Sequence, residues 1–316
     1  MKMMIFRYIS AEIDKLLKSK WVKIAFLIAL ICSLFLILAM PKEEVSWRQS
    51  LQTENYSIEK QLNLTKQELV TSKSHNTLIL QWQINNECLA KNMKPETLNT
   101  RLGNLSQLMS LKNYGLILIV FPILFAVSIA GEFEKGTIKF SLFSPYSRRQ
   151  IILSKFLSVF FISALFLMCV LILNFALNFI FLDSASGVHY IIKAGEIVSE
   201  KSSIFVLKNI LLALPYYFAY VSFAFMLAVV SRSTAISLSI SLFFSLLGTQ
   251  LVNLLHLSDK MLRFILPAIV DLTYYDKSTN IAGEMGISTF SCLITIFVYC
   301  FIFYFIAQET FKNRDI

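Results

Sequence analysis

The sequence has little charge and few residues that interrupt regular structure. Only 16% of its 316 residues are charged, whereas soluble domains average about 25%. Nine glycines and six prolines are too few for a collagen-like or low-complexity chain. The three histidines form no His-Glu-x-x-His motif and the five cysteines form no Cys-x-x-Cys pair, so the sequence predicts no metal site of these kinds. These absences argue against a soluble domain and leave an enzyme without its usual catalytic groups.

Apolar residues make up 56% of the chain, and they fall in long uncharged blocks. A membrane-spanning helix needs about 20 mainly apolar residues, and strand-like alternation is absent from these blocks. We therefore expect an all-α polytopic membrane protein with six transmembrane helices. The blocks are 24–40, 113–130, 156–182, 209–231, 233–258 and 285–308.

The net charge of +9 is concentrated at the ends of these blocks rather than in a nucleic-acid-binding patch. Basic residues are in excess in the N-terminal segment 1–23 and in the connection 131–155, and the tail 309–316 adds two more. The connections 183–208 and 259–284 are balanced or slightly acidic. Because cytoplasmic connections of membrane proteins are enriched in lysine and arginine, we expect both termini and the 131–155 connection in the cytoplasm. The expected location is a bacterial plasma membrane.

The N-terminal segment 1–23 carries an apolar stripe. Phe6, Ile9, Ile13 and Leu16 recur at steps of three and four residues, with charged residues off the stripe. This pattern predicts an amphipathic helix along the inner membrane surface. The alternative is a simple cytoplasmic extension of the first span.

Two connections on the outer side are expected to contain helices. The segment 41–112 predicts an extracellular helical hairpin, with helices near 54–72 and 95–112 and a further helix around Leu78 to Leu89. Substrate capture, partner contact and simple spacing all remain open as its role. The apolar part of 259–284 is too short to cross a membrane, so we expect a broken, re-entrant pair of helices there.

The connection 131–155 superficially resembles a phosphate-binding loop, with Gly-x4-Gly-Thr ending at Thr137. The lysine that would bind phosphate is missing, and Glu132 and Glu134 would repel it. A better interpretation is a short helix near 133–142, a break at Ser144-Pro145, and a second helix that Ser147 caps and that runs into the third span. Such an elbow suits docking into a groove of a partner protein; an ordinary connecting loop is the alternative.

The pattern Glu-x-Glu-x-Gly-Thr, then a short apolar run, Ser-Pro-x-Ser-Arg and a lysine before the next span resembles the permease subunits of type-2 ATP-binding-cassette (ABC) transporters. The long segment 41–112 is similar to the subset of that family with an enlarged first extracellular loop. The residues that match the pattern are Glu132, Glu134, Gly136, Thr137, Ser144, Pro145, Ser147, Arg148 and Lys155, and Phe133 belongs to the same expected coupling surface.

The resemblance implies a mechanism. In that family this loop is the coupling helix, seated in a cleft of a separate ATPase dimer, and two permease subunits form the transport pathway. The resemblance thus implies no cofactor and no enzyme activity in this chain, with ATP and Mg²⁺ on the ATPase. It also implies that Gly136 permits close approach, that Glu132 and Glu134 pair with cations of the partner, and that Arg148 pairs with an acid or a helix end.

Intramembrane polar residues suggest a tentative pathway. The expected spans hold no carboxylate, which argues against an ion-coupled transporter and fits an external energy source. A membrane sensor with an extracellular helical domain remains a second alternative. We expect export of a peptide, antibiotic or other amphipathic compound, with a role in antibiotic resistance. Interhelical hydrogen bonding and packing are the alternative role of the pathway candidates, which are Asn174, Asn178, Tyr216, Tyr217 and Tyr220.

Overall fold

The structure is a computed structural model that describes residues 2–38, 46–63, 77–97, 99–108, 115–193, 196–255, 259–270, 272 and 288–313. Within these residues the regular structure is helical apart from one two-stranded sheet. The helices are α1 (Lys2–Lys18), α2 (Lys20–Leu38), α3 (Trp47–Leu62), α5 (Thr77–Ala90), α6 (Arg101–Leu108), α7 (Gly115–Glu134), α8 (Ile138–Leu142), α9 (Arg148–Phe181), α10 (Ser202–Ser231), α11 (Thr234–Leu255), α12 (Asp259–Leu262), α13 (Leu266–Ile269) and α15 (Thr289–Asn313). The strands are β1 (Val188–Lys193) and β2 (Glu196–Lys201).

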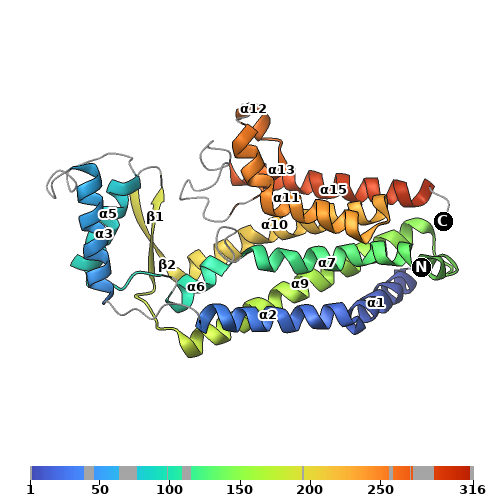
Figure 1. The fold of residues 1–316 in the computed structure, drawn as a ribbon, viewed down its shortest axis with the longest axis horizontal. Coiled ribbons are helices and arrows are strands. Elements are labelled where there is room, and N and C mark those ends of the chain that lie inside the picture. Colours follow the sequence, from blue (N-terminus) through green and yellow to red (C-terminus); the bar gives the residue numbers. More distant parts are fainter. Residues whose placement is uncertain are drawn as a thin grey trace.

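Long apolar helices run side by side along the long axis of the molecule (Figure 1). In the described part of the chain, four helices are long and apolar enough to cross a membrane: α9, α10, α11 and α15. The apolar stretch of α2 is shorter, and α7 is an apolar helix of 20 residues. Helix α1 and the C-terminal part of α15 lie at the same end of the bundle, and α3, α5 and the two strands lie at the opposite end.

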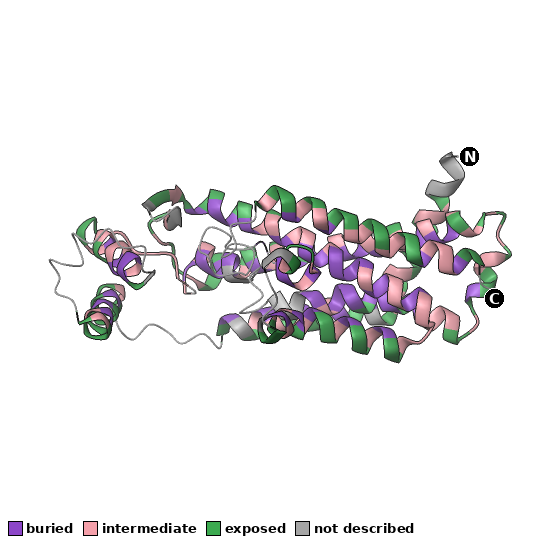
Figure 2. Cartoon of the chain, turned by 90° about the horizontal axis from the view of Figure 1, so that it is seen from above, coloured by how far each residue is buried: buried purple, intermediate pink, exposed green. Residues whose placement is uncertain are grey.

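The core lies between α7, α9 and α10. Ala126 of α7 and Ala219, Ala224 and Ala228 of α10 are fully buried, and such small side chains let helices approach closely. Of the four long helices α10 is the most enclosed and α15 the least. Apolar side chains also cover the outside of the bundle, where Phe297 of α15 is 71% exposed. Figure 2 shows this division, with buried residues inside and exposed residues on the outer faces of the helices. A large exposed apolar surface is typical of a membrane protein.

The outer segment differs in part from the expected hairpin. A helix around Leu78 to Leu89 is present as α5, which packs on α3 through Ile58, Ile79 and Trp82. The helix expected at 54–72 begins earlier, because Ser46 caps α3, and its described part ends at Leu62; residues 64–76 lie outside the described residues.

The helix expected at 95–112 begins later than predicted, and residues 109–114 lie outside the described residues. The carboxylate of Glu96 accepts hydrogen bonds from the Thr100 hydroxyl and the Gly103 amide, so α6 begins only at Arg101. This helix packs against the outer ends of α9 and α10 instead of against α3. The described part of the outer segment is therefore one helix pair and one separate helix on the bundle.

The connection 183–208 forms a β-hairpin that the sequence analysis did not predict. Strands β1 and β2 pair antiparallel, with His189 opposite Glu200 and Tyr190 opposite Ser199. The hairpin leads directly into α10, which begins at Ser202, seven residues before the expected span. The Ser202 amide donates to the carbonyl of Gly187 at the start of the hairpin.

The connection after α11 is a broken helix pair, as expected, within its described part. The short helices α12 and α13 are joined at a bend, and Ile269 of α13 is fully buried. Gly248 of α11 makes this packing possible, because a Cβ there would lie 3.0 Å from the ring of Pro267. Residues 273–287 lie outside the described residues.

Candidate functional site

The elbow, defined as residues 131–155, is built by local signals in the sequence. Helix α7 continues to Glu134 and stops there because Gly136 takes a left-handed conformation with φ of 68°. Helix α8 follows over Ile138–Leu142, anchored by the fully buried side chain of Ile138. The expected single helix over 133–142 is thus split, because the glycine turn interrupts it.

The second half of the elbow matches the prediction closely. Ser147 caps α9: its hydroxyl accepts from the Gln150 amide at 3.3 Å, and its own amide donates to the Gln150 side chain at 2.9 Å. This reciprocal capping box fixes the start of α9 at Arg148. Ser144 and Pro145 lie in the turn before it, and the Ser144 hydroxyl donates to the carbonyl of Ser141.

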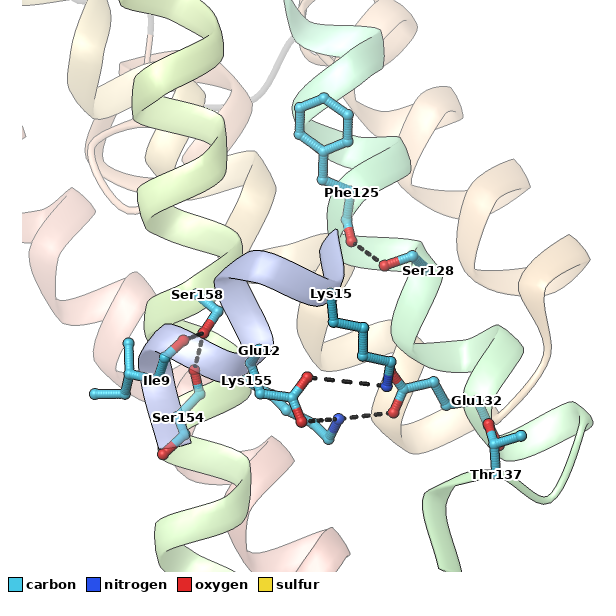
Figure 3. Close-up of polar contacts among 10 residues, drawn as sticks. All are labelled: Ile9, Glu12, Lys15, Phe125, Ser128, Glu132, Thr137, Ser154, Lys155 and Ser158. Atoms are coloured by element: carbon cyan, nitrogen blue, oxygen red, sulfur yellow. Dashed lines mark hydrogen bonds and ion pairs between the residues drawn. The ribbon is translucent and has the colours of Figure 1, made fainter. Parts of the chain in front are cut away.

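A network of four charged side chains joins the elbow to the N-terminal helix (Figure 3). The ammonium group of Lys155, only 1% exposed, donates to Glu12 Oε1 at 2.9 Å and to Glu132 Oε2 at 2.7 Å. Lys15 contacts the other oxygen of Glu132 at 2.5 Å. Two cations therefore face two carboxylates, and the network connects α1, α7 and α9. Buried charges persist only when they are paired in this way.

The electrostatics of Glu132 follow from this pairing. Burial acts to raise the pKa of its carboxyl group, but the ammonium groups of Lys155 and Lys15 outweigh burial and lower the pKa below its ordinary value. Nearby, burial raises the pKa of Tyr8 to about 12. The ring of Tyr8 lies against that of Tyr146, with centroids 4.8 Å apart, which adds a second contact between α1 and the elbow.

Other elbow residues contact the three remaining long helices at this end. Glu134 caps the start of α11, because its carboxylate accepts from the Thr234 amide at 2.7 Å and from the Thr234 hydroxyl at 3.0 Å. The Phe133 ring lies against Phe311 of α15 and beneath the guanidinium of Arg232, which ends α10. These contacts make the elbow a junction for α10, α11 and α15 as well as for α1.

The basic residues at the start of α9 also contact α15. Arg148 donates to the carbonyl of Lys312 at 3.1 Å, and Arg149 lies 3.7 Å from the carboxylate of Glu309. Arg148 thus meets a helix end, one of the two partners expected for it. Within the chain the carboxylate of Glu132 pairs with Lys15 and Lys155, and that of Glu134 accepts from Thr234. Their pairing with cations of a partner stays a prediction.

The tip of the elbow is apolar and exposed. Phe143 is 84% and Phe140 76% exposed, and these are the two most exposed large apolar side chains among the described residues. The exposed side chains of Lys135 and Lys139 lie beside them in the chain. Neither phenylalanine belongs to the pattern of the resemblance, although their three-residue spacing at the end of α8 is a signal for one apolar face.

The elbow's charge network also includes two residues that the sequence analysis missed. Glu12 and Lys15 lie more than one hundred positions from their partners in the elbow. The signal in the sequence is an acidic residue beside the apolar stripe of a mainly basic helix. Thr137, one of the predicted coupling residues, donates through its hydroxyl to the backbone carbonyl of Glu132 at 3.3 Å.

The pathway candidates lie inside the bundle and join helices. Asn174 of α9 donates to the Ser33 hydroxyl of α2 at 3.0 Å, and Asn178 donates to the carbonyl of Arg101. The hydroxyls of Tyr216 and Tyr220 donate to carbonyls of α11 at 3.2 Å, and the ring of Tyr217 contacts that of Tyr216. All five are 1–3% exposed. These contacts match the alternative interpretation, interhelical hydrogen bonding and packing.

Comparisons with known proteins give relatives without a described activity. Residues 88–316 match the family model described as "Protein of unknown function (DUF2705)". An uncharacterized protein of Bacillus subtilis (strain 168), YhcI, is 28% identical over 275 residues, which cover 85% of this chain and 84% of that protein. The family match includes the whole elbow and the four long apolar helices.

Proposed function

We propose that this chain, which belongs to the DUF2705 family of proteins of unknown function, is the permease subunit of a type-2 ABC transporter. The observation that carries the proposal is the elbow. It presents two exposed phenylalanines, Phe140 on α8 and Phe143 directly after it, and is joined by side-chain contacts to α1, α10, α11 and α15. A surface of this kind can bind a partner and transmit its movement to the bundle.

In the proposal the apolar parts of six helices cross the membrane, and the residues of the elbow lie outside it; the helices are α2, α7, α9, α10, α11 and α15. Helices α2 and α7 have 19 and 20 residues. At about 1.5 Å per residue each would extend about 30 Å, the thickness of the hydrocarbon core. The elbow and both termini would then lie in the cytoplasm of a bacterial cell, and α3, α5 and the hairpin outside.

The ATPase would be a separate polypeptide that holds ATP and Mg²⁺, and a second permease subunit would complete the pathway. Closure of the ATPase dimer would move α8, and the rigid connections of the elbow would pass this movement to the spans. The charge network holds α1 to this unit, while Glu134 holds α11 to it. The cargo we propose is a peptide, antibiotic or other amphipathic compound that is exported from the cell.

The first test is recovery of an ABC ATPase with the tagged full-length chain from native membranes. The double variant Phe140→Ala, Phe143→Ala is expected to lower ATPase affinity about tenfold or more, because truncating a buried aromatic anchor typically costs about 2 kcal/mol. The matched control is Phe297→Ala, Phe301→Ala, which removes two rings of α15 that are 71% and 68% exposed. Recovery of an ATPase with both variants alike would contradict the docking role of α8.

A chain that recovers no ABC ATPase would favour the alternative of a membrane sensor. Susceptibility of a deletion strain to a panel of peptide antibiotics tests the proposed cargo. Increased susceptibility to one class is expected, with restoration by the wild-type gene but not by the Phe140→Ala, Phe143→Ala variant.

A further inference from the structure

The corner between α1 and α2 concentrates positive charge on the surface. Helix α1 ends at Lys18 and α2 begins at Lys20, with Ser19 between them. The Ser19 amide donates to the carbonyl of Leu16, and its carbonyl accepts from the amide of Lys23, so the bend is hydrogen-bonded. The side chains of Lys18, Lys20 and Lys23 are all exposed. We call these three lysines the basic corner.

Acidic groups near the basic corner do not neutralise it. Among the described residues none of its three lysines forms an ion pair within 4.0 Å. The carboxylates of Glu12 on α1 and Glu132 on α7 already pair with Lys155 and Lys15. Asp14 is exposed on α1 and makes no ion pair of its own in the described structure. The corner therefore keeps a net positive charge.

An exposed apolar face of α2 begins next to the basic corner. Leu27 is 58% exposed, Ile31 54% and Phe35 67%, at steps of four residues along one side of the helix. On the opposite side Val22, Ala25 and Ala29 are buried against the bundle. In one leaflet of a membrane, charged headgroups cover the hydrocarbon. The lysines at the end of this apolar helix face would lie at the headgroups, and the apolar side chains would lie in the hydrocarbon.

We infer that the basic corner binds the anionic headgroups of phospholipids in the cytoplasmic leaflet and holds the elbow at the leaflet surface. The orientation of the corner rests on the membrane topology of the proposed function, whereas lipid binding itself requires no ATPase. The connection to the elbow runs through α1, whose Glu12 and Lys15 pair with Lys155 and Glu132. Each lysine near an anionic surface is expected to strengthen binding about fivefold, which corresponds to about 1 kcal/mol.

The lipid test uses the purified full-length chain with a mixture of phosphatidylglycerol and phosphatidylcholine, and native mass spectrometry to count the lipids it retains. The variant Lys18→Gln, Lys20→Gln, Lys23→Gln is expected to reduce the preference for phosphatidylglycerol more than tenfold. The matched control Lys60→Gln, Lys91→Gln, Lys201→Gln loses the same charge from exposed positions at the opposite end of the protein and is expected to keep the preference. An unchanged preference in the corner variant, or an equal loss in the control, would overturn the inference.

Further variants distinguish a loss of lipid binding from a failure to fold. Lys18→Arg, Lys20→Arg, Lys23→Arg keeps the charge and is expected to keep the preference for phosphatidylglycerol. If the triple glutamine variant fails to fold, the three single Lys→Gln variants replace it. Each is expected to reduce the preference for phosphatidylglycerol about fivefold. Single variants that all bind phosphatidylglycerol like the wild type would also overturn the inference.

The connection to the elbow has its own readout. Hydrogen exchange of amides in residues 131–142 is expected to slow in the wild type when phosphatidylglycerol replaces phosphatidylcholine, and not to change in the triple glutamine variant. Equal exchange of the wild type in both lipids would exclude the effect on the elbow. A chain that binds phosphatidylglycerol at the corner but recovers no ABC ATPase would refute the proposed function and leave the lipid site standing.

Discussion

The side chain of Lys155 is almost fully buried and lies between two carboxylates. A lone buried ammonium group is strongly unfavourable, and here two carboxylates offset that cost at distances of 2.9 and 2.7 Å. Lys155 also belongs to the pattern by which the sequence resembles a permease. The sequence identified the residue but not its partner Glu12, because that partner comes from a helix 143 positions away.

Replacing Lys155 by methionine is expected to destabilise the fold by about 3–5 kcal/mol, because Glu12 and Glu132 would then be left without their buried cation. Thermal unfolding of the purified chain in detergent measures this loss. Lys139→Met, at an exposed position of the elbow, is the control and should be nearly neutral. Equal stability of the two variants would show that the network contributes little.

The lowered pKa of Glu132 predicts a pH dependence of stability. A carboxyl group whose pKa is lower in the folded than in the unfolded chain stabilises the fold above its ordinary pKa of 4.5 and loses this contribution as pH falls below it. The wild type should thus be more stable than Glu132→Gln at neutral pH, and the difference should shrink below about pH 4.5. Unfolding of both proteins across this range tests the sign, and a difference that grows in acid would contradict it.

At the scale of elements, the sequence predicted helix boundaries well where nearby residues set them. It predicted them poorly where an element depends on contacts with distant segments. The start of α9 followed from Pro145 and Ser147, which act within a few residues. The left-handed Gly136 was present in the sequence, yet its effect on the helix expected at 133–142 was underestimated. The hairpin β1–β2 was missed because a short connection rich in polar residues does not reveal whether its halves pair.

Ser147→Ala is expected to cost about 1 kcal/mol, because the amide of Gln150 loses its acceptor at the start of α9. Ser147→Asp restores an acceptor and should recover most of the stability. Thermal unfolding measures both, with Ser144→Ala as a control in the preceding turn. A greater loss in Ser147→Asp than in Ser147→Ala would rule out capping as the cause.

At the scale of the whole molecule, the two ends of the bundle differ in construction. One end holds the elbow, the charge network and the N-terminal helix, and the other holds the α3–α5 pair and the hairpin (Figure 1). The sequence predicted this division from the distribution of basic residues. It named Asn174 for interhelical hydrogen bonding as an alternative to a pathway but did not predict its partner, because Asn174 and Ser33 lie 141 positions apart.

Single cysteines test the orientation of the two ends. In a cysteine-free background, Lys139→Cys in the elbow is expected to react with a membrane-impermeant maleimide only in inverted vesicles. Lys60→Cys in α3, also exposed, is expected to react only in intact cells. Labelling of both positions from one side would refute the proposed topology of spans.

Helix α9 extends without glycine or proline over 34 residues, about 50 Å at 1.5 Å per residue. Helices α7 and α10 each contain a proline at which they can bend, and α9 does not. Its first residue contacts the carbonyl of Lys312, and near its last residues Phe179 stacks on Arg101, whose side chain also binds the carbonyl of Leu182. An axial shift of α9 at the elbow would therefore also displace α6, and a spectroscopic label on α6 would report movement at the opposite end of the protein.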